Sequence, residues 1–142
     1  MRNFNNNRFD NILGEISSDD NLVINTKLSA PEFTSLLYFL IKNYYYAVIV
    51  DDYPFEIVDK KSLLEALYYQ VKLITMHDLN WDATQEGLSD ALNNFLEFNG
   101  IILLFKNGES LKNNLPNEFK MLSGIIQDIN GQEYHKKIKI LI

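Results

Sequence analysis

The sequence is organised around residues 80–92, which read Asn80-Trp81-Asp82-Ala83-Thr84-Gln85-Glu86-Gly87-Leu88-Ser89-Asp90-Ala91-Leu92. Apolar residues recur here at steps of three and four, the spacing of one side of a helix with about 3.6 residues per turn. They are Trp81, Leu88, Ala91, Leu92 and, just beyond, Phe95. The pattern predicts an amphipathic helix over about 82–97, with its apolar side against a core and Asn80 or Asp82 as its N-cap.

Four acidic residues occupy the opposite side of this helix, each four residues from the next: Asp78, Asp82, Glu86 and Asp90. Glu86 lies two residues from Leu88, about 200° of helix rotation, so the acids face outward. Like charges at this spacing oppose helix formation by about 0.2–0.5 kcal/mol per pair. No Lys or Arg occurs between Lys72 and Lys106 to offset them. A row of acids without a base favours a binding surface over an ordinary solvated face, which is the simpler alternative.

The same stretch resembles the signature of a known family. It is similar to the Asn-x-Asp-Ala-x-x-Asp-x-Leu signature of the barstar family, carried here by Asn80, Asp82, Ala83, Glu86 and Leu88. Members of that family are small intracellular proteins that inhibit a secreted microbial ribonuclease by plugging its basic active site. The resemblance covers about residues 46–142, in the order strand, helix, loop, acidic helix, strand, helix, strand. It implies an α/β fold in a three-layer arrangement.

The resemblance also implies a set of partner-facing residues. Asp82 and Glu86 match the two inhibitory helix acids of the family, which would meet Arg, Lys and His side chains in a ribonuclease cleft. The hydrophobic register of a later helix places Asp128 nearest to a third inhibitory acid, and a slip of one residue would give that role to Gln127. The other residues expected at this surface are Asp78, Asp90, Met76, His77 and Gln85. The residues expected to cap or support the helix are Asn80, Trp81 and Leu88.

Two departures from the family pattern fall on this expected surface. Met76-His77-Asp78 stands where the family usually has paired aromatics and a glycine, and Gln85 stands where it has an aromatic. Trp81 is in phase with the leucines, so it is expected in the core, with an interface anchor as the alternative. The departures concern the identity of the partner and leave the fold unchanged.

Composition and charge limit the classes of function. The chain has 142 residues, 46% of them apolar, no cysteine and a net charge of −6, which predicts one globular domain without disulfides. Residues 51–97 hold ten acids and three bases, whereas the rest of the chain is nearly neutral. Such a field repels nucleic acids and attracts basic proteins. Neither a signal-like N-terminus nor an apolar run of membrane length is evident, so a cytoplasmic location is expected.

The order of apolar segments predicts three parts of the chain. Residues 1–21 are expected to form a flexible polar arm, 22–45 an extension with a short strand and a helix that packs on the core, and 46–142 a barstar-like domain. Capping patterns begin the predicted helices at Ser29 and Asp59. Strands separated by helices favour a small, mostly parallel sheet of about three strands. Asn99-Gly100 is expected to end the acidic helix by a left-handed exit.

Enzyme and metal motifs are not found in the sequence. It contains no Gly-x-Gly-x-x-Gly, no phosphate-binding Gly-Lys-Ser loop and no His-Glu-x-x-His. His77 and His135 are its only histidines, and neither stands at a metal-ligand spacing, so no metal or cofactor is expected. Carboxylates on one exposed ridge share one environment, whereas an acid and base pair needs two unlike ones.

The sequence therefore predicts a binding protein that is not an enzyme. The leading hypothesis is a 1:1 inhibitor of a basic ribonuclease or ribonuclease-type toxin domain, in which the acidic helix mimics RNA phosphates. The alternative is an immunity or regulatory module for a different basic toxin or protein, which binds through the same helix without blocking RNA cleavage.

Overall fold

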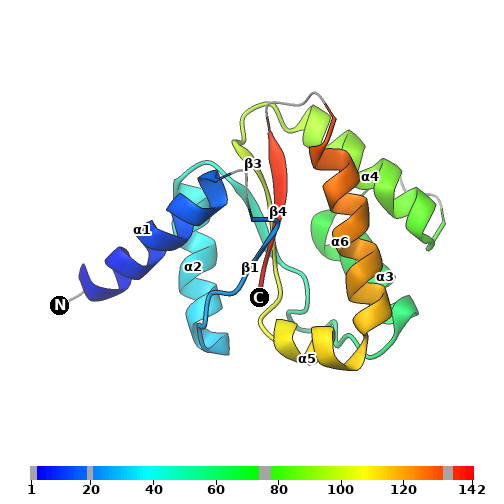
Figure 1. Cartoon of the computed structure of the whole chain (residues 1–142), viewed down its shortest axis with the longest axis horizontal. Coiled ribbons are helices and arrows are strands. Elements are labelled where there is room, and N and C mark those ends of the chain that lie inside the picture. Colours follow the sequence, from blue (N-terminus) through cyan, green and yellow to red (C-terminus); the bar gives the residue numbers. More distant parts are fainter. Residues whose placement is uncertain (1–2, 19–20, 74–77, 133–135) are drawn as a thin grey trace.

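A single parallel sheet runs through the part of the chain that the structure describes. The computed structural model describes residues 3–18, 21–73, 78–132 and 136–142. The strands of the sheet are β1 (Val23–Ile24), β2 (Tyr46–Ile49), β3 (Gly100–Leu104) and β4 (Lys137–Leu141). They lie in the order β1-β4-β3-β2 (Figure 1). The α/β class and the parallel pairing are confirmed, and the sheet has one strand more than the expected three because the short segment at 23–24 pairs with β4.

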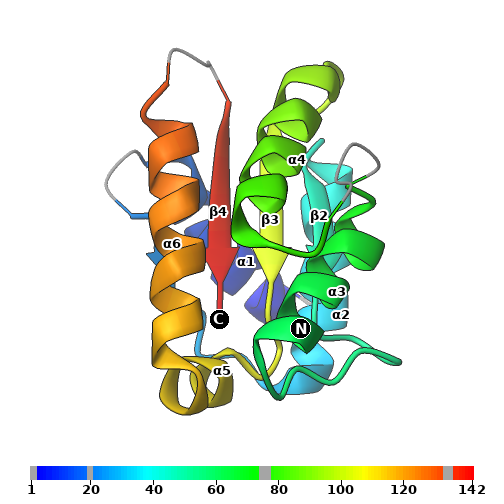
Figure 2. The ribbon, with the colours of Figure 1, turned by 90° about the vertical axis from the view of Figure 1, so that its right-hand side faces the viewer.

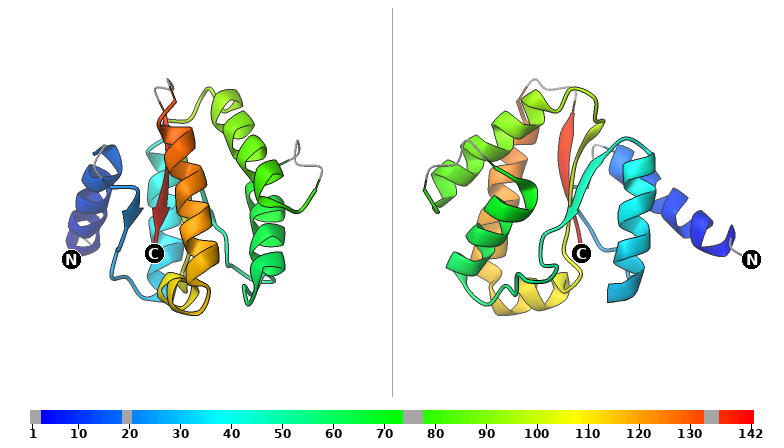
Figure 3. Two further views of the ribbon diagram at one scale, coloured as in Figure 1. Left: turned by 45° about the vertical axis from the view of Figure 1, so that its right-hand side comes forward. Right: turned by 180° about the vertical axis from the view of Figure 1, so that it is seen from behind.

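Helices cover both faces of this sheet. The described residues contain α1 (Asn3–Ser17), α2 (Ala30–Lys42), α3 (Lys60–Val71), α4 (Trp81–Asn94), α5 (Gly108–Asn114) and α6 (Pro116–Asn130). Figure 2 shows α4 and α6 on the near face of the sheet, with α1 and α2 behind it. In the right-hand view of Figure 3 the sheet separates α1 and α2 from α3, α4 and α6. The molecule thus has the three-layer arrangement that the sequence predicts.

Successive side chains along each strand point to opposite faces of the sheet and so enter two different cores. In the register that pairs Ile101 with Tyr46 and Ile138, one set of strand residues packs with α3, α4 and α6. The next residue along each strand faces α1 and α2, as Ile102 and Leu104 of β3 do. Because both faces are covered, the central strand β3 is buried throughout, which is why it reads as an uninterrupted apolar run.

The interpretation of residues 1–21 as a flexible arm is wrong for residues 3–17, which form α1. Phe9, Ile12 and Ile16 follow the helical spacing and are buried in the core beside α2. The ring centroids of Phe9 and Phe39 lie 5.4 Å apart, and Arg8 forms an ion pair of 2.9 Å with Glu32. Asparagine is a poor helix former, so the composition of this segment does not indicate a helix. Tertiary contacts stabilise the helix instead.

The acidic helix ends earlier than predicted, at Asn94, with Phe95 as its C-cap. Gly100 is the first residue of β3 and provides no left-handed exit, since no described glycine has a positive φ. A Cβ at Gly100 would lie 2.6 Å from the carbonyl oxygen of Lys137. Close approach of two strands, and not helix termination, therefore requires the glycine at this position.

Candidate functional site

The start of α4 is fixed by local hydrogen bonds. The side chain of Asn80 accepts a hydrogen bond of 2.7 Å from the backbone N–H of Ala83, which identifies Asn80 and not Asp82 as the N-cap. The buried Thr84 donates its hydroxyl to the carbonyl of Asn80 over 2.8 Å. Leu88 is fully buried at the same time. Cap and core together fix the rotation of the helix about its axis.

This rotation turns the acidic side of α4 to solvent. We call the four residues Asp78, Asp82, Glu86 and Asp90 the acidic ridge, and all four side chains are exposed. No Lys or Arg among the described residues forms an ion pair with any of them. The ridge is therefore a row of uncompensated negative charge. Asp82, Glu86 and Asp90 lie on α4 about one helical turn apart, whereas Asp78 precedes the N-cap Asn80 and lies just before the helix.

Helix α6 packs beside α4, and a hollow of about 480 Å³ lies between them. We call it the α4–α6 hollow. Its lining residues are Trp81, Asp82 and Gln85 from α4, and Asn117, Lys120, Met121, Gly124, Ile125, Gln127 and Asp128 from α6. Residues at least 32 positions apart in the sequence thus meet at one site. Both candidates for the third contact, Gln127 and Asp128, line the hollow, and only Asp128 carries a charge.

The remaining predicted site residues take different places. A neighbouring hollow of about 400 Å³ is lined by Asp82, Gln85 and Glu86 together with Gln132, so Glu86 lies at the edge of the same surface. Asp90 continues the ridge one turn further along α4 and lines neither hollow. Met76 and His77 lie outside the described residues.

A comparison with protein families gives this geometry a context. The family model described as Barstar (barnase inhibitor) matches residues 55–142. The chain belongs to the barstar family. The match contains α3, α4 and α6 of this barstar-family chain, and hence both walls of the α4–α6 hollow, whereas α1, β1, α2 and β2 precede it. The comparison with curated proteins and that with solved structures found no match.

Two lining residues of the α4–α6 hollow in this barstar-family chain, Trp81 and Lys120, add to what the sequence predicts. Trp81 is half-buried: it packs against the core cluster and also lines the hollow, so the two alternatives for this residue are not exclusive. Lys120 places a base among the acids, which our reading of the sequence missed. The signal was present, because Lys120, Gly124 and Asp128 stand four residues apart and so share one side of α6.

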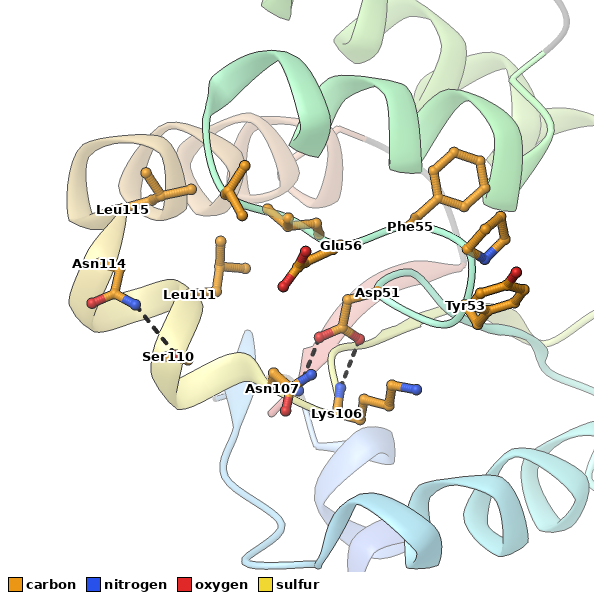
Figure 4. A pocket seen from close by; sticks show the side chains of 13 residues that line it. Asp51, Tyr53, Phe55, Glu56, Lys106, Asn107, Ser110, Leu111, Asn114 and Leu115 are labelled. Carbon is orange, nitrogen blue, oxygen red and sulfur yellow. Dashed lines mark hydrogen bonds between the residues drawn. The ribbon is translucent and has the colours of Figure 1, made fainter.

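A second region of this barstar-family chain concentrates polar groups without belonging to the acidic surface. A hollow of about 510 Å³ lies where β2 and β3 end (Figure 4). The buried carboxylate of Asp51 accepts hydrogen bonds of 2.8 and 2.9 Å from the backbone N–H groups of Lys106 and Asn107. Burial raises the pKa of this carboxyl, against the opposing effect of the two hydrogen bonds. Asp51 therefore holds the turn after β3 in place, and both its oxygens are used in doing so.

Other classes of site receive little support from the described residues. No group of three His, Asp or Glu side chains there could hold a metal ion. No helix in the same part of the chain is long and apolar enough to cross a membrane.

Proposed function

We propose that this chain inhibits a basic ribonuclease by inserting the acidic ridge of α4 into the active site of the enzyme. One observation carries the proposal: Asp82 and Glu86, at the positions of the family's inhibitory acids, are exposed, uncompensated and fixed on a capped helix. Carboxylates about one turn apart present successive negative charges to a cleft that binds successive phosphates. The proposed role is that of an intracellular antidote, acting in the cytoplasm on a ribonuclease or ribonuclease-type toxin domain.

The charge distribution supports rapid and salt-dependent association. Ten of the nineteen acids lie within residues 51–97, against three of the thirteen bases. A surface of one sign steers an oppositely charged partner and raises the association rate at low salt. The side chains are held on a helix with a side-chain N-cap, so little ordering of the helix is required on binding. The mechanism requires no metal or cofactor.

One observation favours the alternative, an immunity or regulatory module for another basic protein. Lys120 lines the α4–α6 hollow beside Asp82 and Asp128, and a purely phosphate-like surface would have no ammonium there. A partner that meets this surface outside its catalytic cleft would still bind the acidic ridge. Competition separates the two functions, because an oligonucleotide displaces an inhibitor from an active site and leaves a binder at another surface in place.

The first experiment is a titration of the purified chain into barnase and other small basic microbial ribonucleases, following RNA cleavage at low and high salt. The variant Asp82→Lys with Glu86→Lys should weaken inhibition by about 4 kcal/mol, roughly a thousandfold, because cations of the enzyme lose their partners. The matched control is Asp10→Lys with Glu15→Lys, which makes the same change of net charge at exposed positions of α1.

The control should change association only through the long-range field, and this change should disappear at high salt. Stoichiometric inhibition that the ridge variant loses and the control keeps would support the proposal. Equal inhibition by the ridge variant and the control would refute the assignment of the site. Binding to a ribonuclease without loss of RNA cleavage would instead select the alternative.

A further inference from the structure

Gly124 has no packing reason to be a glycine. It lies in the middle of α6 (Pro116–Asn130), where glycine is a poor helix former. A Cβ at this position would meet no heavy atom of the described residues within 4 Å, apart from its own helix. The glycine is therefore not required by a neighbouring side chain or by backbone conformation. It does line the α4–α6 hollow, where the missing side chain adds depth.

The α4–α6 hollow is lined by both apolar and polar residues. Trp81 is half-buried, Ile125 is buried, and Met121 is 47% exposed although it is apolar. Apart from Gly124, the other lining residues are polar: Asp82, Gln85, Asn117, Lys120, Gln127 and Asp128. Apolar side chains bordered by polar groups are typical of the pockets that hold anchor side chains at protein interfaces.

We propose that the α4–α6 hollow is a socket for one apolar or aromatic side chain of the basic partner, next to the cations that meet the acidic ridge. This inference rests on the proposed function. The exposed carboxylates of Asp82 and Asp128 in the lining match a partner whose surrounding surface is basic. The ammonium of Lys120 in the same hollow disfavours the insertion of a cationic side chain. The apolar lining residues then select a Leu, Met or aromatic side chain, and Gly124 leaves the space it fills.

A series of side chains of increasing size at Gly124 tests the socket. Gly124→Ala should weaken inhibition of the ribonuclease by about 3-fold or less, and Gly124→Leu by about 100-fold, chiefly through faster dissociation. Both variants should keep or raise the thermal stability, since each removes a helical glycine. The matched control is Gly14→Leu: Gly14 also lies in a helix with open space around it, but on α1 and outside the hollow.

Trp81 provides a direct readout of the socket. It is the only tryptophan of the chain, so the protein labelled with 5-fluorotryptophan has a single fluorine resonance. Saturation with barnase, or with another inhibited ribonuclease of the panel, should shift this resonance in the wild-type chain. The shift between free and bound protein should be largely lost in Gly124→Leu measured at a saturating concentration.

Four outcomes separate this inference from the proposed function. Loss of inhibition in Gly124→Leu, with Gly14→Leu unaffected and the Trp81 shift lost, supports the socket. Inhibition by Gly124→Leu at the wild-type level overturns the socket while leaving the proposed function standing, provided that the ridge variant Asp82→Lys with Glu86→Lys is inactive. Full inhibition by the ridge variant overturns the proposed function and with it the socket. A wild-type chain that inhibits none of the ribonucleases does the same.

Discussion

Helices α1 and α4 are of similar length, 15 and 14 residues, and lie on opposite faces of the sheet, yet they are specified in different ways. α4 carries its own start signal in Asn80, a clear apolar side and the family signature. α1 is rich in asparagine and has no acid in its first turn and no base in its last. Its apolar side chains indicate a helix only once it is known that they are buried against the second face of the sheet.

The two helices also differ in what their outer sides do. The outer side of α4 keeps three acids, Asp82, Glu86 and Asp90, that no described base neutralises, at a cost in helix stability. α1 instead contributes Arg8 to an ion pair with Glu32 of α2. In the proposed function the layer that contains α4 contacts a partner, whereas the layer of α1 and α2 makes contacts within the chain. A helix that keeps unfavourable charge is thus a better indicator of function than one that neutralises it.

Core truncations should give the largest effects on stability and should separate the two helices. Leu88→Ala in α4 and Ile12→Ala in α1 should each lower the free energy of unfolding by about 2–5 kcal/mol. Because α1 depends on tertiary contacts, Ile12→Ala should also remove the hydrogen-exchange protection of the amides in residues 3–17, through local unfolding of α1 while the rest of the protein stays folded. Chemical denaturation and exchange on each variant measure both effects.

Asn11→Ala, at an exposed position of α1, serves as the control for the truncations and should change stability by about 0.5 kcal/mol or less. Full protection of α1 in Ile12→Ala would contradict the view that buried contacts hold this helix. It would mean that α1 is stable by itself, contrary to what its asparagine-rich sequence indicates.

Removal of the cap should have an intermediate effect that is confined to α4. Asn80→Ala removes the acceptor for the N–H of Ala83 and should cost about 1 kcal/mol of unfolding free energy, whereas Asn80→Asp should retain the cap. The same loss should loosen the acidic ridge and weaken ribonuclease binding. Denaturation and inhibition measured on the Ala and Asp variants together test this, and equal behaviour of the two would exclude a capping role.

The carboxylate of Glu32, which accepts hydrogen bonds from Ser29 in the cap of α2 and pairs with Arg8 of α1, should give the smallest effect, and one that depends on pH. Hydrogen bonds from Ser29, with a smaller contribution from Arg8, lower the pKa of Glu32 below its ordinary value of 4.5. The ionised carboxylate therefore stabilises the fold above that value, and this stabilisation is lost as the pH falls through the lowered pKa. Glu32→Gln should cost about 0.5 kcal/mol at neutral pH, given the exposure of the pair.

As the pH falls through the lowered pKa of Glu32, the difference between Glu32→Gln and the wild type should shrink, because the wild-type side chain also becomes neutral. Thermal unfolding at a series of pH values from 7 into acid measures the comparison. A difference that persists unchanged in acid would assign the effect to packing and not to charge.

The sequence was most informative where a feature depends on neighbours along the chain. The burial of Leu88 and the exposure of Asp82 and Glu86 follow from helical spacing alone, whereas the choice between Asn80 and Asp82 as the cap required the structure. The α4–α6 hollow required the structure, since Trp81 and Gly124 lie far apart in the chain. Spacing along α6 could have revealed that Lys120 shares a side with Asp128, but not that this side meets α4.

By itself, the sequence determined the class of the fold, the apolar strands, the capped acidic helix and the direction in which its charges point. These properties arise from local periodicity, capping and composition. Only the tertiary structure decided that β1 adds a fourth strand beside β4, that an asparagine-rich segment is a helix, that Asp51 holds the turn after β3, and that α4 and α6 enclose a hollow. Each of these depends on burial and hydrogen bonds between residues distant along the chain, whose pairing local patterns do not encode.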